Sequence, residues 1–97
     1  MKLDDELVKE AHVLLHPIRF RIVELLEKQP MHINAISKAL EEKKKKLVSY
    51  HLGILEDHGF VNSKYEISEQ PKSKGKALKM YWVTDKVNEV VGELKKM

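Results

Sequence analysis

Residues 43–61 have the sequence KKKKLVSYHLGILEDHGFV, which contains the strongest structural signal in the chain. Apolar residues recur at the spacing of one helix face, at Val48, Leu52 and Leu55, so a helix is predicted here. Gly59 suits the left-handed position at which many helices end. The four lysines are unfavourable at the start, because a helix N-terminus already carries about half a positive charge. An anionic partner would compensate for them, and the backbone of a nucleic acid is the simplest candidate.

Four elements are predicted before this helix. Apolar residues at helical spacing predict a first helix over residues 2–15 and a second that begins at Pro17 and stops before Pro30. Residues 31–33 are too few for more than a short strand. Asn34 is expected to cap a short third helix, which the lysine-led helix follows almost at once.

After Gly59 the apolar residues alternate with polar ones, which predicts a half-exposed strand over residues 61–68. A lysine-rich loop follows, and residues 78–84 form a second strand, so the two make a hairpin with a basic tip. Thr84 is expected to cap a last helix. The predicted fold class is therefore mainly α with a small β-hairpin, in the order helix, helix, strand stub, helix, helix, strand, strand, helix.

Length and composition indicate one small domain over residues 1–97. The chain has no cysteine, which excludes disulfides and thiolate metal sites. It has neither an apolar run long enough to span a membrane nor a signal peptide, so a cytoplasmic location is expected, associated with the nucleoid.

The positive charge is concentrated in one part of the chain. Residues 43–81 hold nine lysines and four acidic residues, whereas the remainder holds nine Lys or Arg and eleven acidic residues. The net charge of +3 therefore hides a basic segment that contains the lysine-led helix and the hairpin. Such a distribution is typical of a nucleic-acid-binding surface.

Three motifs, at residues 15–26, 48–61 and 81–84, resemble those of the ArsR-type winged helix-turn-helix transcriptional regulators. Residues 15–26, LHPIRFRIVELL, are similar to the opening motif of that family, and residues 48–61 resemble its recognition segment. Residues 81–84, YWVT, resemble its wing exit. The order and spacing of the three also match. The chain is most similar to archaeal-like members that lack the metal-site cysteines.

The resemblance implies a homodimer that binds double-stranded DNA, with the fourth helix in the major groove and the hairpin, or wing, on the flanking backbone. If Val48, Leu52 and Leu55 face the core, the opposite side of their helix faces outward. The predicted DNA-binding residues lie on that side, at its lysine-rich start and on the wing: Lys44, Lys45, Lys46, Ser49, Tyr50, Gly53, Lys72, Lys74 and Lys76. Gly53 has an alternative explanation, which is tight helix packing inside the domain.

The sequence departs from the family pattern at two places. The family usually turns between its third and fourth helices at a glycine, but residues 40–44 contain none, so this boundary is not defined by the sequence. The thiolate pair of the third helix is also absent. His12 and His16 are four residues apart, but they have no obvious partner ligands, so we expect no metal and no cofactor.

Apolar residues on the first and last helices predict a dimer interface, since a domain this small cannot bury both stripes fully. The predicted interface residues are Leu3, Leu7, Ala11, Leu14, Val87, Val90, Val91 and Leu94.

The sequence favours a sequence-specific transcriptional regulator, with repression the expected action. Two alternatives stay open, which are a low-specificity chromatin-like DNA-binding protein and a winged helix that binds only proteins. An enzyme is not expected, because no cysteine nucleophile, glycine-rich phosphate loop or Ser/His/acid set is present. The sequence identifies neither the operator nor an effector.

Overall fold

The structure, a computed structural model, describes residues 4–67 and 75–96 of the 97-residue chain. Its elements occur in the predicted order, and they form five helices and a three-stranded antiparallel sheet with the strand order β1-β3-β2. The elements are α1 (Asp5–Leu14), α2 (Pro17–Lys28), β1 (Met31–His32), α3 (Ile33–Ala39), α4 (Lys45–Asp57), β2 (Val61–Ile67), β3 (Ala77–Val83) and α5 (Lys86–Lys95). The predicted fold class is confirmed. None of the helices in the described ranges is long and apolar enough to cross a membrane.

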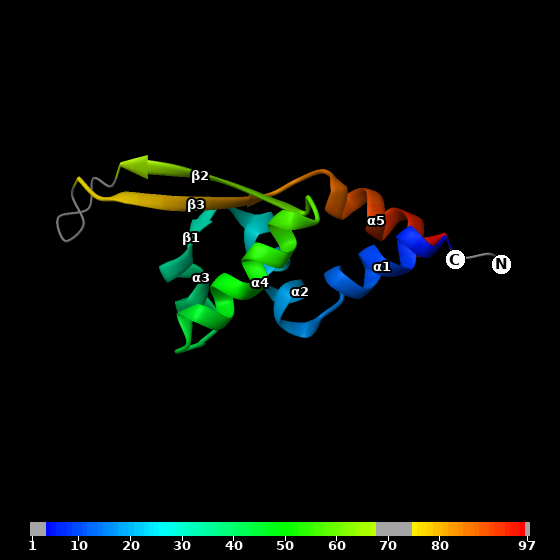
Figure 1. Ribbon diagram of the computed structural model, residues 1–97, viewed down its shortest axis with the longest axis horizontal. Coiled ribbons are helices and arrows are strands. Elements are labelled where there is room, and N and C mark those ends of the chain that lie inside the picture. Colours follow the sequence, from blue (N-terminus) through cyan, green and yellow to red (C-terminus); the bar gives the residue numbers. More distant parts are fainter. Residues whose placement is uncertain (1–3, 68–74, 97) are drawn as a thin grey trace.

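The molecule is elongated, with extents of 55 × 24 × 20 Å. Helices α2, α3 and α4 form its body against the base of the sheet, and the hairpin β2–β3 projects from the body at one end (Figure 1). Helices α1 and α5 lie together at the other end. The hairpin and the pair of helices α1 and α5 therefore lie on opposite sides of the central body (Figure 1).

Helix α4 contributes one full side to the core, as its apolar spacing predicts. Val48, Leu52 and Leu55 are fully buried, together with Ile22 of α2 and Ile36 of α3. Burying an aliphatic side chain of this size stabilises the fold by about 1.5 to 3 kcal/mol. The opposite side of α4 is thereby directed outward.

The end of α4 has the predicted geometry. Gly59 has φ +79°, and its amide donates to the carbonyl of Glu56 over 3.0 Å. The amide of Phe60 donates to the carbonyl of Leu55 over 2.9 Å, and both side chains are fully buried. These two bonds define a Schellman motif, so the predicted helix end is confirmed.

A tight turn at Glu41 and Glu42 precedes α4, although no glycine in the sequence predicts it. Glu41 has φ +56°, which lies in the left-handed region that glycine adopts most easily. The amide of Glu42 donates to the carbonyl of Ser37 over 2.9 Å. The helix begins at Lys45, with Lys44 as its N-cap. Lys45 and Lys46 therefore lie in the first turn of the helix, and Lys43 and Lys44 precede it.

Two predicted caps differ from the structure. The N-cap of α3 is His32, because the chain becomes helical directly after β1, and Asn34 lies inside the helix. The N-cap of α5 is Asp85, one residue beyond Thr84. The hydroxyl of Thr84 nevertheless accepts the amide of Lys86 over 3.3 Å and donates to the carbonyl of Gly59 over 2.6 Å. Thr84 therefore links the start of α5 to the end of α4.

The expectation that α1 and α5 leave their apolar stripes uncovered is wrong for three residues. Leu14, Val87 and Val90 are buried within the protomer, where α1 and α5 pack against each other and α1 also contacts α2 and α4. Leu7, Ala11, Val91 and Leu94 stay half-buried, and Leu3 lies outside the described residues.

The left-handed turn generates a prediction about stability. The Glu41→Gly variant should raise the free energy of unfolding by about 0.5 to 1 kcal/mol, because glycine adopts this conformation without the penalty that other residues incur. Chemical denaturation measures the change. Glu42→Gly is the matched control and should destabilise the fold, since Glu42 lacks a positive φ and its carboxylate accepts the amide of Lys44 over 3.0 Å. Equal losses in both variants would contradict this account of the turn.

Candidate nucleic-acid interface

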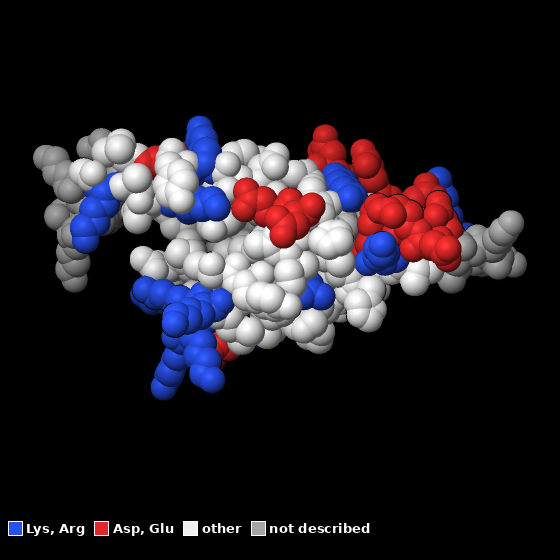
Figure 2. Space-filling model, viewed as in Figure 1, with Lys and Arg blue, Asp and Glu red and all other residues white. Residues whose placement is uncertain are grey.

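The lysine cluster, Lys43 to Lys46, is exposed at the start of α4. The first turn of this helix contains no acidic residue, and its N-cap side chain makes no capping hydrogen bond. Within the described part of the chain, no carboxylate forms an ion pair with any of the four lysines. Figure 2 shows them as a projecting group of positive charge on the body. The start of α4 is therefore a site where an anion is favoured, and the carboxylate of Glu42, which accepts the amide of Lys44, forms no ion pair with the ammonium groups.

The outward side of α4 extends this cluster. Ser49 is exposed, and Tyr50 retains 62% of its accessible surface. A Cβ atom added to Gly53 would meet no atom within 4 Å, so packing inside the domain does not explain this glycine. Glu56 follows three residues after Gly53, and helical spacing places Ser49, Gly53 and Glu56 along one stripe. We call this stripe, with Lys45, Lys46 and Tyr50, the α4 face.

The wing carries part of the predicted site. Lys76 is exposed just before β3, whereas Lys72 and Lys74 lie outside the described residues. The predicted site omits three exposed residues of β2, which are Lys64, Tyr65 and Ile67. The alternation of apolar and polar residues places Tyr65 and Ile67 on the same strand face as Val61, which is buried. It does not predict the point at which the strand extends beyond the body and this face becomes exposed.

A polar link joins the α4 face to the wing. The hydroxyl of Ser63 donates to Glu56 over 2.6 Å, and the ammonium of Lys79 lies 3.6 Å from the other oxygen of Glu56. Both partners come from the hairpin, while Glu56 belongs to the last turn of α4. The link therefore holds the base of the wing against the recognition-type helix.

A second link holds α4 from beneath. The guanidinium of Arg19 donates to the carbonyl of Val13 over 2.6 Å and to Nδ1 of His51 over 3.1 Å. Arg19 and His51 are both buried, and the ring of His16 lies 4.6 Å from that of His51. One arginine on α2 thus connects α1 to the helix that carries the exposed lysines.

Hydrogen bonding determines the protonation of both rings. Arginine has no acceptor, so Nδ1 of His51 is unprotonated and its hydrogen resides on Nε2. His16 accepts the amide of Ile18 at Nδ1 over 3.2 Å, which likewise places its hydrogen on Nε2. Burial, together with His16 and Arg19, lowers the pKa of His51 below its usual value. His51 is therefore a neutral structural residue, and His16 is occupied in capping α2.

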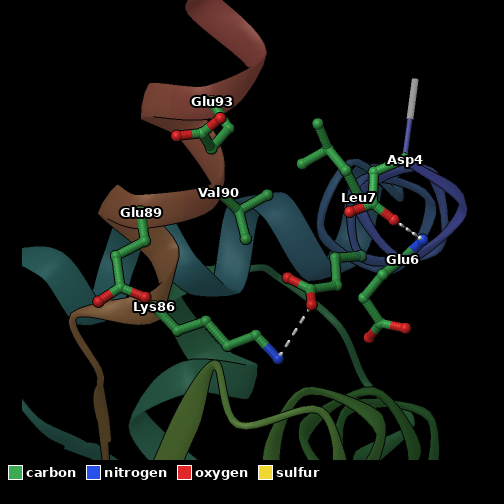
Figure 3. Close-up of a pocket in the computed structure, with 8 residues that line it drawn as sticks. Asp4, Glu6, Leu7, Lys86, Glu89, Val90 and Glu93 are labelled. Atoms are coloured by element: carbon green, nitrogen blue, oxygen red, sulfur yellow. Dashed lines mark hydrogen bonds and ion pairs between the residues drawn. The ribbon is translucent and has the colours of Figure 1, made fainter. Parts of the chain in front are cut away.

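The opposite end of the molecule is acidic. A groove of about 380 Å³ between α1 and α5 is lined by five carboxylates, one lysine and two apolar side chains (Figure 3): Asp4, Glu6, Leu7, Glu10, Lys86, Glu89, Val90 and Glu93. The ammonium of Lys86 lies 3.6 Å from Glu10 and donates to the carbonyl of His58 over 2.5 Å. Lys86 is therefore bound by groups of the protein itself, and the other charged residues that line the groove are carboxylates, so the groove does not favour a polyanion.

Comparison with known proteins agrees with this geometry. A family model described as a helix-turn-helix domain matches residues 14–64, which is more than half of the chain. The chain belongs to this helix-turn-helix family. No curated protein sequence matches it significantly.

Solved structures show the same fold. Diamide-treated YodB from B. subtilis has a TM-score of 0.79 at 16% identity, over 100% of this chain and 90% of that one. The transcriptional regulator homologue from Pyrococcus horikoshii OT3 has a TM-score of 0.66 at 22% identity, over 94% and 92%. The ArsR family regulator RHA00566 has a TM-score of 0.70 at 15% identity, over 99% and 90%. The predicted winged helix-turn-helix fold is thereby confirmed, and the proteins that share it include transcriptional regulators, one of them of the ArsR family.

The neutral His51 generates a prediction about pH. Its pKa is lowered in the folded protein from the unfolded value of 6.5, so the unfolded chain binds more protons below that pH. The stabilisation is fully present above about pH 6.5 and is lost as the pH falls from there towards the lowered folded pKa. Urea denaturation between pH 7.5 and 5 should show a smaller loss of stability in His51→Gln than in the unaltered protein. Identical pH slopes for the two proteins would show that His51 is not held neutral.

Proposed function

We propose that the protein is a sequence-specific repressor that binds double-stranded DNA as a homodimer, with α4 in the major groove and the wing on the flanking backbone. The uncompensated lysine cluster at the start of α4 carries this proposal. DNA phosphates would supply the negative charge that the fold does not, and the cluster would release condensed counter-ions on binding.

The residues of the interface divide into two roles. Lys44, Lys45 and Lys46 contact phosphates, and they position the helix without reading the sequence. Ser49 and Tyr50 present hydroxyl groups from the next turn, where they reach the base edges. Gly53 allows the backbone of α4 to approach the duplex closely, because its outward side is open.

The wing supplies the flanking contacts. Lys76 is exposed at the start of β3 and would bind backbone phosphates there. Lys72 and Lys74 are proposed for the same role from their positions in the sequence. A protein seated on both groove and backbone would exclude other proteins from the same promoter, which supports repression.

The proposed dimer uses the apolar surface that α1 and α5 retain. Val8 and Leu15 keep 48% and 54% of their accessible surface, and they lie on α1 and at its end. The half-buried Leu7, Ala11, Val91 and Leu94 extend the same end of the molecule. Two copies related by a two-fold axis would place their α4 helices about 34 Å apart, which corresponds to one turn of DNA and requires a nearly palindromic operator.

A pair of substitutions on the α4 face tests the proposed function. Lys46→Ala should weaken binding to every duplex alike and reduce the dependence of log K on log salt by about two units per dimer, because each protomer loses about one phosphate contact. Tyr50→Ala should instead reduce the preference for operator over random DNA, by about 1 to 3 kcal/mol. Lys95→Ala is the matched control, because this exposed lysine lies on α5 at the opposite end of the long axis (Figure 1).

Fluorescence anisotropy at several salt concentrations, with operator selected from a random pool, measures all three variants. Equal effects of Lys46→Ala and Tyr50→Ala on every sequence would indicate a low-specificity, chromatin-like binder. The proposal would be overturned if neither Lys46→Ala nor Tyr50→Ala reduced the affinity for DNA, or if only Lys95→Ala reduced it.

The dimer has its own test. Leu15→Glu should convert the protein to a monomer at micromolar concentration, since it places a charge in the proposed apolar contact. Leu15 is half-exposed in the protomer, so the fold should tolerate the change. Sedimentation equilibrium gives the molecular mass, and Lys9→Glu introduces the same carboxylate at another exposed position of α1 as a control. A monomer before any substitution would refute dimerisation through this surface.

A further inference from the structure

We propose that Tyr65 and Ile67 of the wing form an apolar contact with the sugar edges of the DNA minor groove. This inference rests on the proposed function and adds a contact that salt does not weaken. Both side chains are largely exposed, with 69% and 66% of their accessible surface retained. An exposed aromatic and an exposed aliphatic residue on adjacent positions of one strand face form a patch that water solvates poorly.

The strand register defines the face on which this patch lies. Tyr65 pairs with Lys79 and Ile67 with Ala77, while nearer the body Ser63 pairs with Tyr81. Directly paired residues share one face of an antiparallel sheet, so these six residues form a continuous strip. The strip begins at buried Tyr81 and becomes exposed as the hairpin leaves the body.

The same face is continuous with the α4 face. Glu56, at the end of the stripe that contains Ser49 and Gly53, accepts a hydrogen bond from Ser63 and pairs with Lys79. Both of these partners belong to the strip on the wing. A duplex that lies along the α4 face would therefore meet the strip of Tyr65 and Ile67 next.

The charges around the patch favour DNA over an apolar protein surface. Lys79 shares the face, with its ammonium 5.9 Å from the centre of the Tyr65 ring, and the exposed Lys76 precedes Ala77. A minor groove presents the same combination, because apolar deoxyribose edges lie between two rows of phosphates. Apolar side chains that enter this groove contact sugars and base steps, while neighbouring lysines bind phosphates.

The opposite face of the hairpin provides a matched control. Lys64 is exposed and pairs with Met80, so its side chain lies on the other side of the sheet from Tyr65. Substitutions at these three positions affect exposed side chains on one strand. Their effects on folding should therefore be small and similar, which circular dichroism and thermal unfolding verify.

The experiment measures DNA affinity over a range of salt concentrations for Tyr65→Ala, Ile67→Ala and Lys64→Ala. We expect each of the first two to weaken binding about five- to ten-fold at every salt concentration, with the slope of log K against log salt unchanged. Lys64→Ala should leave affinity at high salt unchanged.

The outcomes separate this inference from the proposed function. If Tyr65→Ala and Ile67→Ala leave affinity unchanged while Lys46→Ala still weakens it, the wing contact is wrong and the DNA-binding function stands. If none of the variants affects binding to DNA, the proposed function fails as well. Loss of dimer mass in Tyr65→Ala or Ile67→Ala by sedimentation would assign the patch to a second copy of the chain and overturn the inference.

Discussion

The buried guanidinium of Arg19 is the interaction on which the position of α4 depends. A buried charge without partners costs several kcal/mol, so the two acceptors of Arg19 must stay where they are. One is the carbonyl of Val13 in α1 and the other is the ring of His51 in α4. Since His51 directly follows Tyr50, this requirement also orients the residues that face outward. The stability of the core and the presentation of the α4 face therefore share one contact.

A second link holds the last turn of α4. Glu56 binds Ser63 and Lys79 of the hairpin, and the hydroxyl of Thr84 binds the carbonyl of Gly59 directly after α4. The helix is thus held from α2 beneath it and from the wing beside it. The lysine cluster lies beyond both links, at the free start of the helix. A charged surface on a fixed support is suited to binding a rigid duplex without a large ordering cost.

Much of the fold could be predicted because its strongest signals are local. Helical spacing on α4 and the glycine at its end determine where that helix lies and which side it buries, and both predictions are confirmed. The turn at Glu41 could not be predicted, because a left-handed glutamate is stabilised by backbone contacts with α3 and not by its own preference. The burial of Leu14 and Val90 could not be predicted either, since it depends on how α1 and α5 pack against each other and against the body.

The candidate site was predictable in part for the same reason. The outward residues of α4 follow from the helical period once its buried side is known. The exposure of Tyr65 and Ile67 does not follow from the period of two, because that period gives the face of a strand but not the point where the body stops covering it. His16 and His51 are similar cases, since their hydrogen bonds come from residues that are distant in the sequence or depend on local chain geometry.

The separation of charge along the molecule has a consequence for how ionic strength acts on it. Carboxylates line the groove between α1 and α5, so pairing two copies at this end brings like charges together. Added electrolyte screens that repulsion and favours the paired form, whereas at the lysine-rich end it competes with the duplex. The two associations thus respond to the same variable with opposite signs. Occupancy of an operator by a paired regulator would then pass through a maximum at an intermediate ionic strength.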